Sequence, residues 1–88
     1  MNLKKLIYTV LEQMVRSAKR GDNKKILSLN REFERLLPQV FPDLSDTSRG
    51  EYDNCRQSCV MSTDPKFAKM HDKFLADALQ RFRRIPKP

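Results

Sequence analysis

Apolar residues recur along this chain at the spacing of helical turns. Between residues 2 and 20 they occupy positions 3, 6, 7, 10, 11, 14, 15 and 18, which line one face of an amphipathic helix. Asn2 is a suitable N-cap, and Gly21 supplies a stop. A second helix is predicted over residues 22–37, begun by Asp22 or Asn23 and ended by Pro38, which disfavours helical dihedrals in the residue before it.

The second half of the chain has a weaker pattern and then a strong one. Residues 38–47 contain two prolines and are expected to form an irregular loop whose apolar residues cover the core. A short helix is predicted over residues 49–60, with Ser48 as its cap and Tyr52, Cys55 and Cys59 on one face. A last long helix is predicted over residues 64–85, capped by Asp64.

These elements predict an all-α fold, a compact bundle of three long helices and one short helix. No segment shows the sustained alternation of a strand, and 88 residues suffice for one domain, residues 1–88. The connection between the first two helices is short, so they should be antiparallel. Phe33 and Phe74 lie in the middle of the apolar stripes and are expected to be buried.

The composition favours a folded protein with anionic partners. Hydrophobic residues make up 39% and charged residues 33% of the sequence, and the formal net charge is +7. No stretch approaches the roughly 18 apolar residues of a membrane span, and no export signal is apparent. The two cysteines then fit reduced thiols, which predicts a cytoplasmic location.

Candidate chemistry is sparse. Cys55 and Cys59 stand four residues apart, but His71 is the only histidine, so a zinc site lacks obvious ligands. His71 is expected to be a boundary residue with one hydrogen bond. No phosphate loop, nucleophile elbow or zinc-protease motif is present. The sequence therefore predicts no catalytic residue, metal, cofactor or evident small-molecule substrate, and a protein that is not an enzyme.

Basic residues gather in two clusters, while residues 43–64 are acidic. If the three long helices run up, down and up, both clusters fall at one end, and we expect them to form one face, the footprint expected for phosphate contacts. A short helix that reverses the chain places them at opposite ends instead. The first cluster comprises Arg16, Lys19, Arg20, Lys24 and Lys25, and the second comprises Arg81, Arg83, Arg84 and Lys87.

Two functions are compatible with this pattern. The first is a non-enzymatic regulatory protein whose basic helical surface docks on an anionic macromolecule, with nucleic acid as the expected partner and DNA and RNA left open. The alternative is a protein–protein adaptor or inhibitor, acting through its helices and as a possible homodimer. Tyr8 and Val15 lie at the edge of the first stripe and are its candidate contact residues.

Overall fold

A computed structural model describes residues 2–88, which form four α-helices, two short 3-10 helices and no strand. The α-helices are α1 (Leu3–Arg20), α2 (Asn23–Val40), α3 (Asp46–Met61) and α4 (His71–Arg84), and the 3-10 helices are η1 (Phe41–Asp43) and η2 (Pro65–Met70). The all-α prediction is confirmed. The division into three long helices and one short helix is confirmed only in part, because α3 and α4 have 16 and 14 residues.

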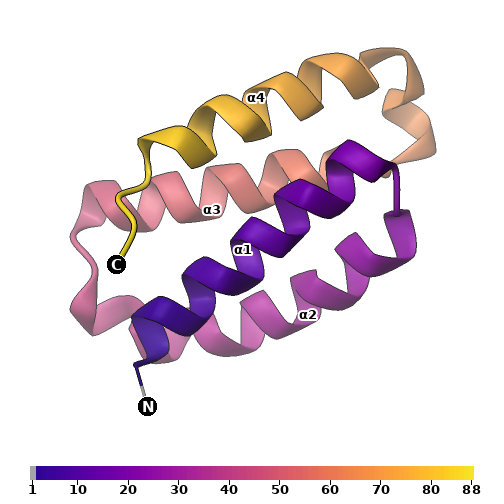
Figure 1. Cartoon of the computed structure of the whole chain (residues 1–88). Coiled ribbons are helices and arrows are strands. Elements are labelled where there is room, and N and C mark those ends of the chain that lie inside the picture. The colour runs from indigo at the N-terminus through magenta and orange to yellow at the C-terminus, as the bar shows by residue number, and fades with distance from the viewer. Residues whose placement is uncertain (1) are drawn as a thin grey trace.

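Local capping fixes the first hairpin as the sequence predicts. The Asn2 side chain accepts a hydrogen bond from the Lys5 amide at 3.1 Å, and Gly21 ends α1 in the left-handed region with φ 69°. Asp22 then caps α2 by accepting from the Lys25 amide at 3.2 Å. Only two residues separate the helices, so α2 runs antiparallel to α1 (Figure 1).

The predicted end of the second helix is wrong, because α2 continues through Pro38 to Val40. Pro38 lacks an N–H, and this leaves the Glu34 carbonyl without its usual helical partner. Both residues are exposed, so water can satisfy that carbonyl, while the Val40 side chain is fully buried. Burial in the core therefore outweighs the local preference against a helical residue before proline.

The predicted short helix is also longer than expected. Ser45, not Ser48, caps α3 by accepting from the Ser48 amide at 3.2 Å, and the helix extends over Gly50 to Met61. The predicted buried face of Tyr52, Cys55 and Cys59 is confirmed. At 16 residues, α3 is nearly as long as α1 and α2 and runs along the bundle (Figure 1). The chain therefore reverses direction again after α3, and α4 runs opposite to the direction expected for three long helices.

The predicted last helix is interrupted near its beginning. Asp64 is the cap, as expected, but residues 65–70 form η2, and Phe67 has non-helical dihedrals. The expectation that Phe74 is buried is wrong. After the interruption the Phe74 ring lies half-buried against Phe67 in an edge-to-face pair with centroids 5.6 Å apart. Phe33 is fully buried, as predicted.

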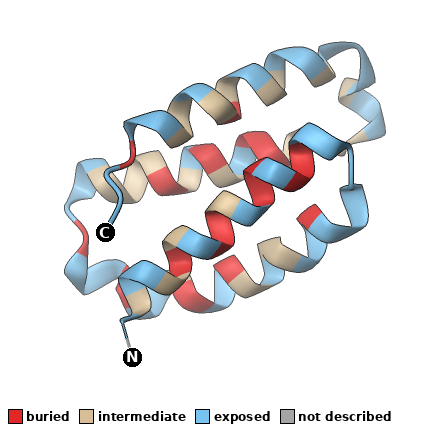
Figure 2. Ribbon diagram, in the orientation of Figure 1, coloured by how far each residue is buried: buried red, intermediate tan, exposed pale blue. Residues whose placement is uncertain are grey.

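The helices pack as two antiparallel hairpins, α1–α2 and α3–α4, and α1 contacts all three other helices. Seven residues of α1 are buried (Figure 2), whereas Ala78 is the one buried residue of α4 in the described chain. A polar link joins α3 to α4, because Ser58 donates to Asp77, which also accepts from Arg81 at 2.8 Å. Across residues 2–88, none of the helices combines the length and apolarity needed to cross a bilayer.

Candidate anion-binding surface

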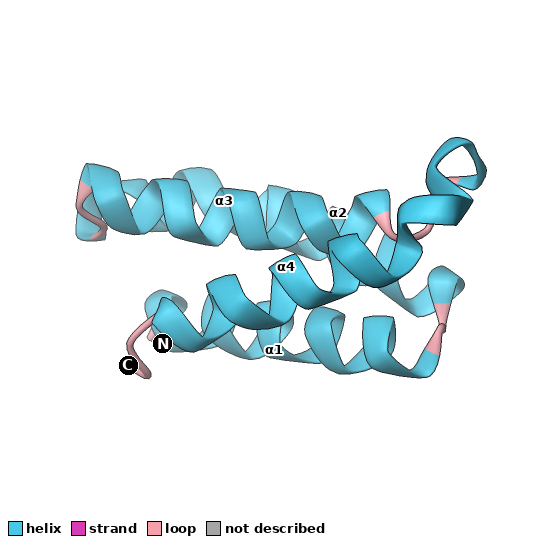
Figure 3. Ribbon diagram, turned by 90° about the horizontal axis from the view of Figure 1, so that it is seen from above, coloured by secondary structure: helices cyan, strands magenta, loops and turns pink. Residues whose placement is uncertain are grey.

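The path of the chain separates the two predicted basic clusters. The Tyr8 and Phe82 rings are 5.1 Å apart, so the beginning of α1 lies beside the end of α4. Figures 1 and 3 accordingly show both termini at one end of the molecule and the α1–α2 turn at the other. The expectation that both clusters share one face is therefore wrong, because the full-length α3 reverses the chain and sends α4 back toward the N-terminus.

The first cluster remains a coherent surface around the α1–α2 turn. We call it the turn cluster: Arg16, Lys19, Arg20, Lys24 and Lys25, all of them exposed. Asp22 is the only acidic residue in this stretch, and its side chain is engaged as the α2 cap. Arg16 forms only a long contact of 3.8 Å with Glu12 and stays 67% exposed. The turn cluster is thus available to an external anion.

Two lysines of the turn cluster lie at a helix end where a cation is unfavourable. Lys24 and Lys25 occupy the first turn of α2, at the positive end of the helix dipole, and no acidic residue accompanies them in that turn. Cations there are unfavourable by roughly 0.3–1 kcal/mol each at low ionic strength. A bound phosphate reverses this penalty, because it is attracted by both the dipole and the side chains.

A hollow between α1 and α2 brings several donors of the turn cluster together. It has a volume of about 260 Å³ and is lined by Gln13, Arg16, Ser17, Arg20 and Lys25. Arg20 is held over it by donating to the buried Ser17 hydroxyl at 3.2 Å. Guanidinium and ammonium groups converging on one hollow suit an oxyanion such as a phosphate group.

The second predicted cluster is weaker. Arg81 pairs with Asp77 through its Nε atom at 2.8 Å, so its charge is balanced within the molecule. Arg83, Arg84 and Lys87 are exposed, but they lie at the end where α3 begins. Asp43, Asp46, Glu51 and Asp53 of that segment oppose their charge, while Lys4, Lys5 and Arg49 at the starts of α1 and α3 add to it. The field at this end is therefore mixed rather than uniformly positive.

Sequence reasoning missed three other cations. Lys66, Lys69 and Lys73 are exposed and lie in η2 and the first turn of α4. Figures 1 and 3 place this corner at the same end as the turn cluster. Their spacing of three and four residues is the sequence signal that could have grouped them, because residues so spaced share one side of a helix. The end of the molecule at which they lie is known only from the path of the chain. We call these three lysines and the turn cluster together the basic end.

The residues predicted for the adaptor alternative are not displayed on the surface. Val15 is only 4% exposed, so the expectation that it is accessible is wrong: the apolar face of α1 is wider than its edge position suggests. Tyr8 is half-buried against Phe82. The large apolar side chains that are exposed within residues 2–88 are Leu27, Phe41 and Met70, and these belong to three separate elements.

The thiols are buried parts of the core. Cys55 and Cys59 are free cysteines with no solvent exposure, and the Cys55 thiol donates to the Ala78 carbonyl at 3.4 Å. The neighbouring Cys59 thiol, followed by burial, raises the pKa of Cys55 well above its ordinary value, so it remains a protonated thiol. Over residues 2–88, no group of three or more histidine, cysteine or acidic residues is placed to hold a metal ion.

His71 has the boundary position expected of it. Its Nδ1 atom lies 3.0 Å from the Ser62 carbonyl, and the side chain is partly exposed. A carbonyl oxygen only accepts, so Nδ1 carries the hydrogen in this contact. The bond ties the corner before α4 to the end of α3, which is a structural role.

Comparison with models of protein families, with curated proteins and with solved structures finds no match to this chain.

Proposed function

We propose that this chain is a non-enzymatic binding protein that docks on nucleic acid through its basic end. The observation that carries the proposal is the turn cluster, where five exposed cations meet with a single carboxylate, already used as a helix cap. Phosphate contacts account for most of the affinity of a non-specific protein–nucleic acid complex. Lys66, Lys69 and Lys73 add positive charge at the same end of the molecule, partly offset by Asp64 and Asp72 of the same segment.

The size of the basic end fits a backbone contact. The molecule measures 37 × 22 × 18 Å, so a surface at the end of the long axis is about 22 by 18 Å across. Duplex DNA carries one charge for roughly every 1.7 Å of its axis, so such a surface can face several phosphates at once. Such a surface contacts the phosphate backbone of the nucleic acid, so we propose binding that does not depend on the base sequence.

A direct binding titration tests this function. Fluorescence anisotropy is measured with labelled duplex DNA, duplex RNA and single strands of each, at a low and a moderate salt concentration. The proposal expects binding at low salt that weakens steeply as salt rises, because bound cations release counterions from the phosphates. Absence of binding to all four probes at low salt would overturn it.

A protein–protein role is the second candidate, and one exposed feature favours it. Met70 is 39% exposed and lies in η2, the element that also carries Phe67, whose ring packs edge-to-face on Phe74. Burial of this apolar corner against a second copy predicts a homodimer with shallow salt dependence. Sedimentation equilibrium of the protein and of Met70→Glu decides it: a dimer lost in the variant supports the candidate, and a monomer in both contradicts it.

A further inference from the structure

The hollow between α1 and α2 is a recess within the basic end, and its donors are open to solvent. Gln13, Arg16 and Arg20 are spaced by three and four residues, so they share one side of α1. Lys25 comes from the first turn of α2, so two helices contribute to the lining. All four of these residues are exposed, and a ligand in the hollow can therefore contact each of them.

The lining of the hollow carries positive charge only. Arg16, Arg20 and Lys25 are its charged members, and none of its lining residues is acidic. Glu12 makes only the long contact of 3.8 Å with the Arg16 guanidinium. The fully buried Ser17 hydroxyl accepts from Arg20 at 3.2 Å and so positions that guanidinium before a ligand arrives. This lining suits an anion with more than one negative charge.

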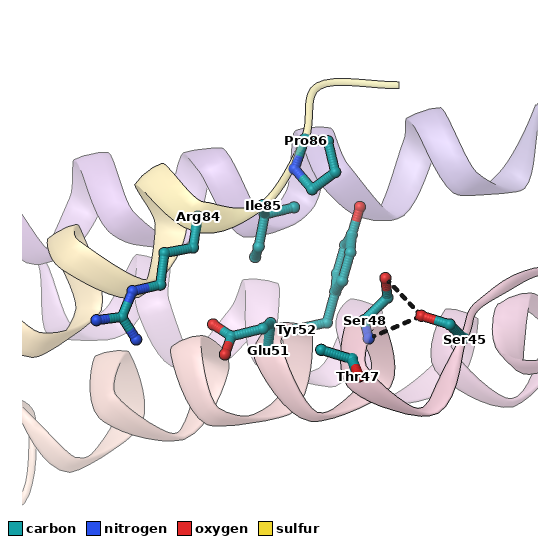
Figure 4. A pocket seen from close by; sticks show the side chains of 8 residues that line it. All are labelled: Ser45, Thr47, Ser48, Glu51, Tyr52, Arg84, Ile85 and Pro86. Atoms are coloured by element: carbon teal, nitrogen blue, oxygen red, sulfur yellow. Dashed lines mark hydrogen bonds between the residues drawn. The ribbon is translucent and has the colours of Figure 1, made fainter.

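The cavity at the opposite end of the molecule differs in just these respects. It has a volume of about 210 Å³ and lies between the beginning of α3 and the end of α4 (Figure 4). Its lining includes the Glu51 carboxylate as well as Arg84, and the Tyr52 and Ile85 side chains in its wall are only 2% and 5% exposed. A doubly charged anion there would be repelled by the carboxylate. Of these two recesses, the hollow of the basic end is the one that suits phosphate.

Size and charge together select the end of a strand over its interior. The volume of the hollow, about 260 Å³, is below the roughly 300–1,000 Å³ of pockets that enclose small-molecule ligands, so it suits one phosphate group better than a whole nucleotide. A phosphate monoester carries a charge of about −1.5 to −2 at pH 7 and three acceptor oxygens, enough to engage two guanidiniums and an ammonium. An internal phosphodiester carries one charge, and the strand must enter and leave on both sides of it.

We infer that this hollow binds the terminal phosphate monoester of a nucleic acid strand. Arg16, Arg20 and Lys25 donate to the terminal oxygens, and the Gln13 amide adds a neutral donor. Internal phosphates of the same strand contact the rest of the turn cluster. The inference rests on the proposed function for the identity of the strand, and it adds that an end of the strand is recognised.

Anisotropy titration of matched DNA single strands at constant low salt tests this inference. Strands that end in a 5′-phosphate or a 3′-phosphate, with the fluorophore on the opposite end, are compared with the unphosphorylated strand. A further unphosphorylated strand, longer by two nucleotides, matches the added charge. We expect a phosphorylated strand to bind at least about tenfold more tightly than both unphosphorylated strands, because it alone makes the charge-assisted contacts in the hollow.

The outcomes separate this inference from the proposed function. If the phosphorylated strands bind no more tightly than the longer unphosphorylated strand, the recognition of a strand end is overturned and the proposed function stands. If no strand binds, both are overturned.

Two neighbouring lysines provide matched variants. Lys25→Gln and Lys24→Gln each remove one charge from the same helical turn, but only Lys25 lines the hollow. Lys25→Gln should abolish most of the tenfold preference for the phosphorylated strand, whereas Lys24→Gln should weaken all strands alike and keep the preference. A circular dichroism melt verifies that each variant is folded, and Arg16→Gln replaces Lys25→Gln if the latter unfolds. A preference that survives in the folded lining variant would contradict the inference.

Inorganic phosphate identifies the source of the bound group. In a nuclear magnetic resonance titration at constant ionic strength, millimolar phosphate should give saturable shifts of amides in residues 13–25, and Lys25→Gln should weaken them. Absence of such shifts would overturn the hollow as a phosphate site. Saturable shifts in a protein that binds none of the strands would assign the hollow to free phosphate, and would overturn the strand-end inference together with the proposed function.

Discussion

The two hairpins of this protein are held together in different ways. The α1–α2 hairpin has caps at its turn and an interior of apolar side chains, and α1 alone contributes seven buried residues. In the α3–α4 hairpin, α4 contributes Ala78, and the contact between the helices includes buried thiols and the Ser58–Asp77–Arg81 link. Burial of apolar area thus dominates one hairpin, and specific polar contacts matter more in the other.

The largest expected effect comes from truncating a phenylalanine of each hairpin. Phe33→Ala should lower the free energy of unfolding by about 3–5 kcal/mol, because it leaves a cavity in the core. Phe74→Ala should cost less than about 2 kcal/mol, since that ring is already partly in water. Urea unfolding monitored by circular dichroism gives both values. Equal losses would show that the α3–α4 side is packed as tightly as the α1–α2 side.

Local opening should follow the same division. Amide hydrogens of α4 are expected to exchange through openings that cost on the order of 2 kcal/mol less than those of α1, because few of the α4 side chains are buried. Native-state hydrogen exchange measures the two helices in one experiment. Uniform protection throughout residues 3–84 would mean that the hairpins open only together.

Acid should weaken the α3–α4 hairpin in particular. The Ser58 hydroxyl, and next to it Arg81, hold the pKa of Asp77 below its ordinary value of about 4. A carboxylate whose pKa is lowered by folding stabilises the native state above that ordinary value, and the contribution is lost as pH falls through the lowered pKa. The difference in unfolding free energy between the protein and Asp77→Asn should therefore shrink from pH 7 to strongly acidic pH. A constant difference in urea titrations would contradict this assignment.

Chelation should have no effect on either hairpin. Cys55 and Cys59 are predicted to be reduced and metal-free, because within residues 2–88 no further histidine, cysteine or acidic side chain is placed to complete a zinc site with them. Elemental analysis should find no stoichiometric zinc in the purified protein, and EDTA should leave the melting temperature unchanged. One zinc per chain or per dimer would require a ligand set supplied from outside these helices.

The sequence determined the first hairpin better than the second for a physical reason. Asn2, Gly21 and Asp22 act through local hydrogen bonds, so their roles are visible in the sequence. The helix end predicted before Pro38 is wrong because burial of the Val40 side chain stabilises one more helical turn, although proline disfavours helical dihedrals in the residue before it. Tertiary burial is not visible in a local pattern, and it shifted the end of α2 by one turn.

The error over α3 had the larger consequence for the candidate site. Ser45 begins this helix three residues earlier than the predicted Ser48 cap, and the resulting 16-residue helix sends α4 in the opposite direction. The turn cluster was found from sequence because its residues are neighbours along the chain. Whether it lies near Arg83 or near Lys66 depends on the direction of α4, which the sequence does not determine.

Charge reversal on each hairpin tests the proposed function most directly. Arg20→Glu with Lys24→Glu alters the turn cluster, and Arg83→Glu with Arg84→Glu makes the same charge change on the other hairpin. Both pairs are exposed, so each substitution should change stability by only about 0.5 kcal/mol. Anisotropy titrations with duplex DNA and RNA over a salt series then give affinity and salt slope for all three proteins.

We expect only the Arg20/Lys24 pair to affect nucleic-acid binding. The Arg20/Lys24 variant should bind more weakly, with a logarithmic salt slope shallower by about 2, one for each lost phosphate contact. The Arg83/Arg84 variant should bind like the unmodified protein, because its charges lie at the mixed end. Equal weakening by both variants, or unchanged binding by the Arg20/Lys24 variant, would contradict the assignment of function to the basic end.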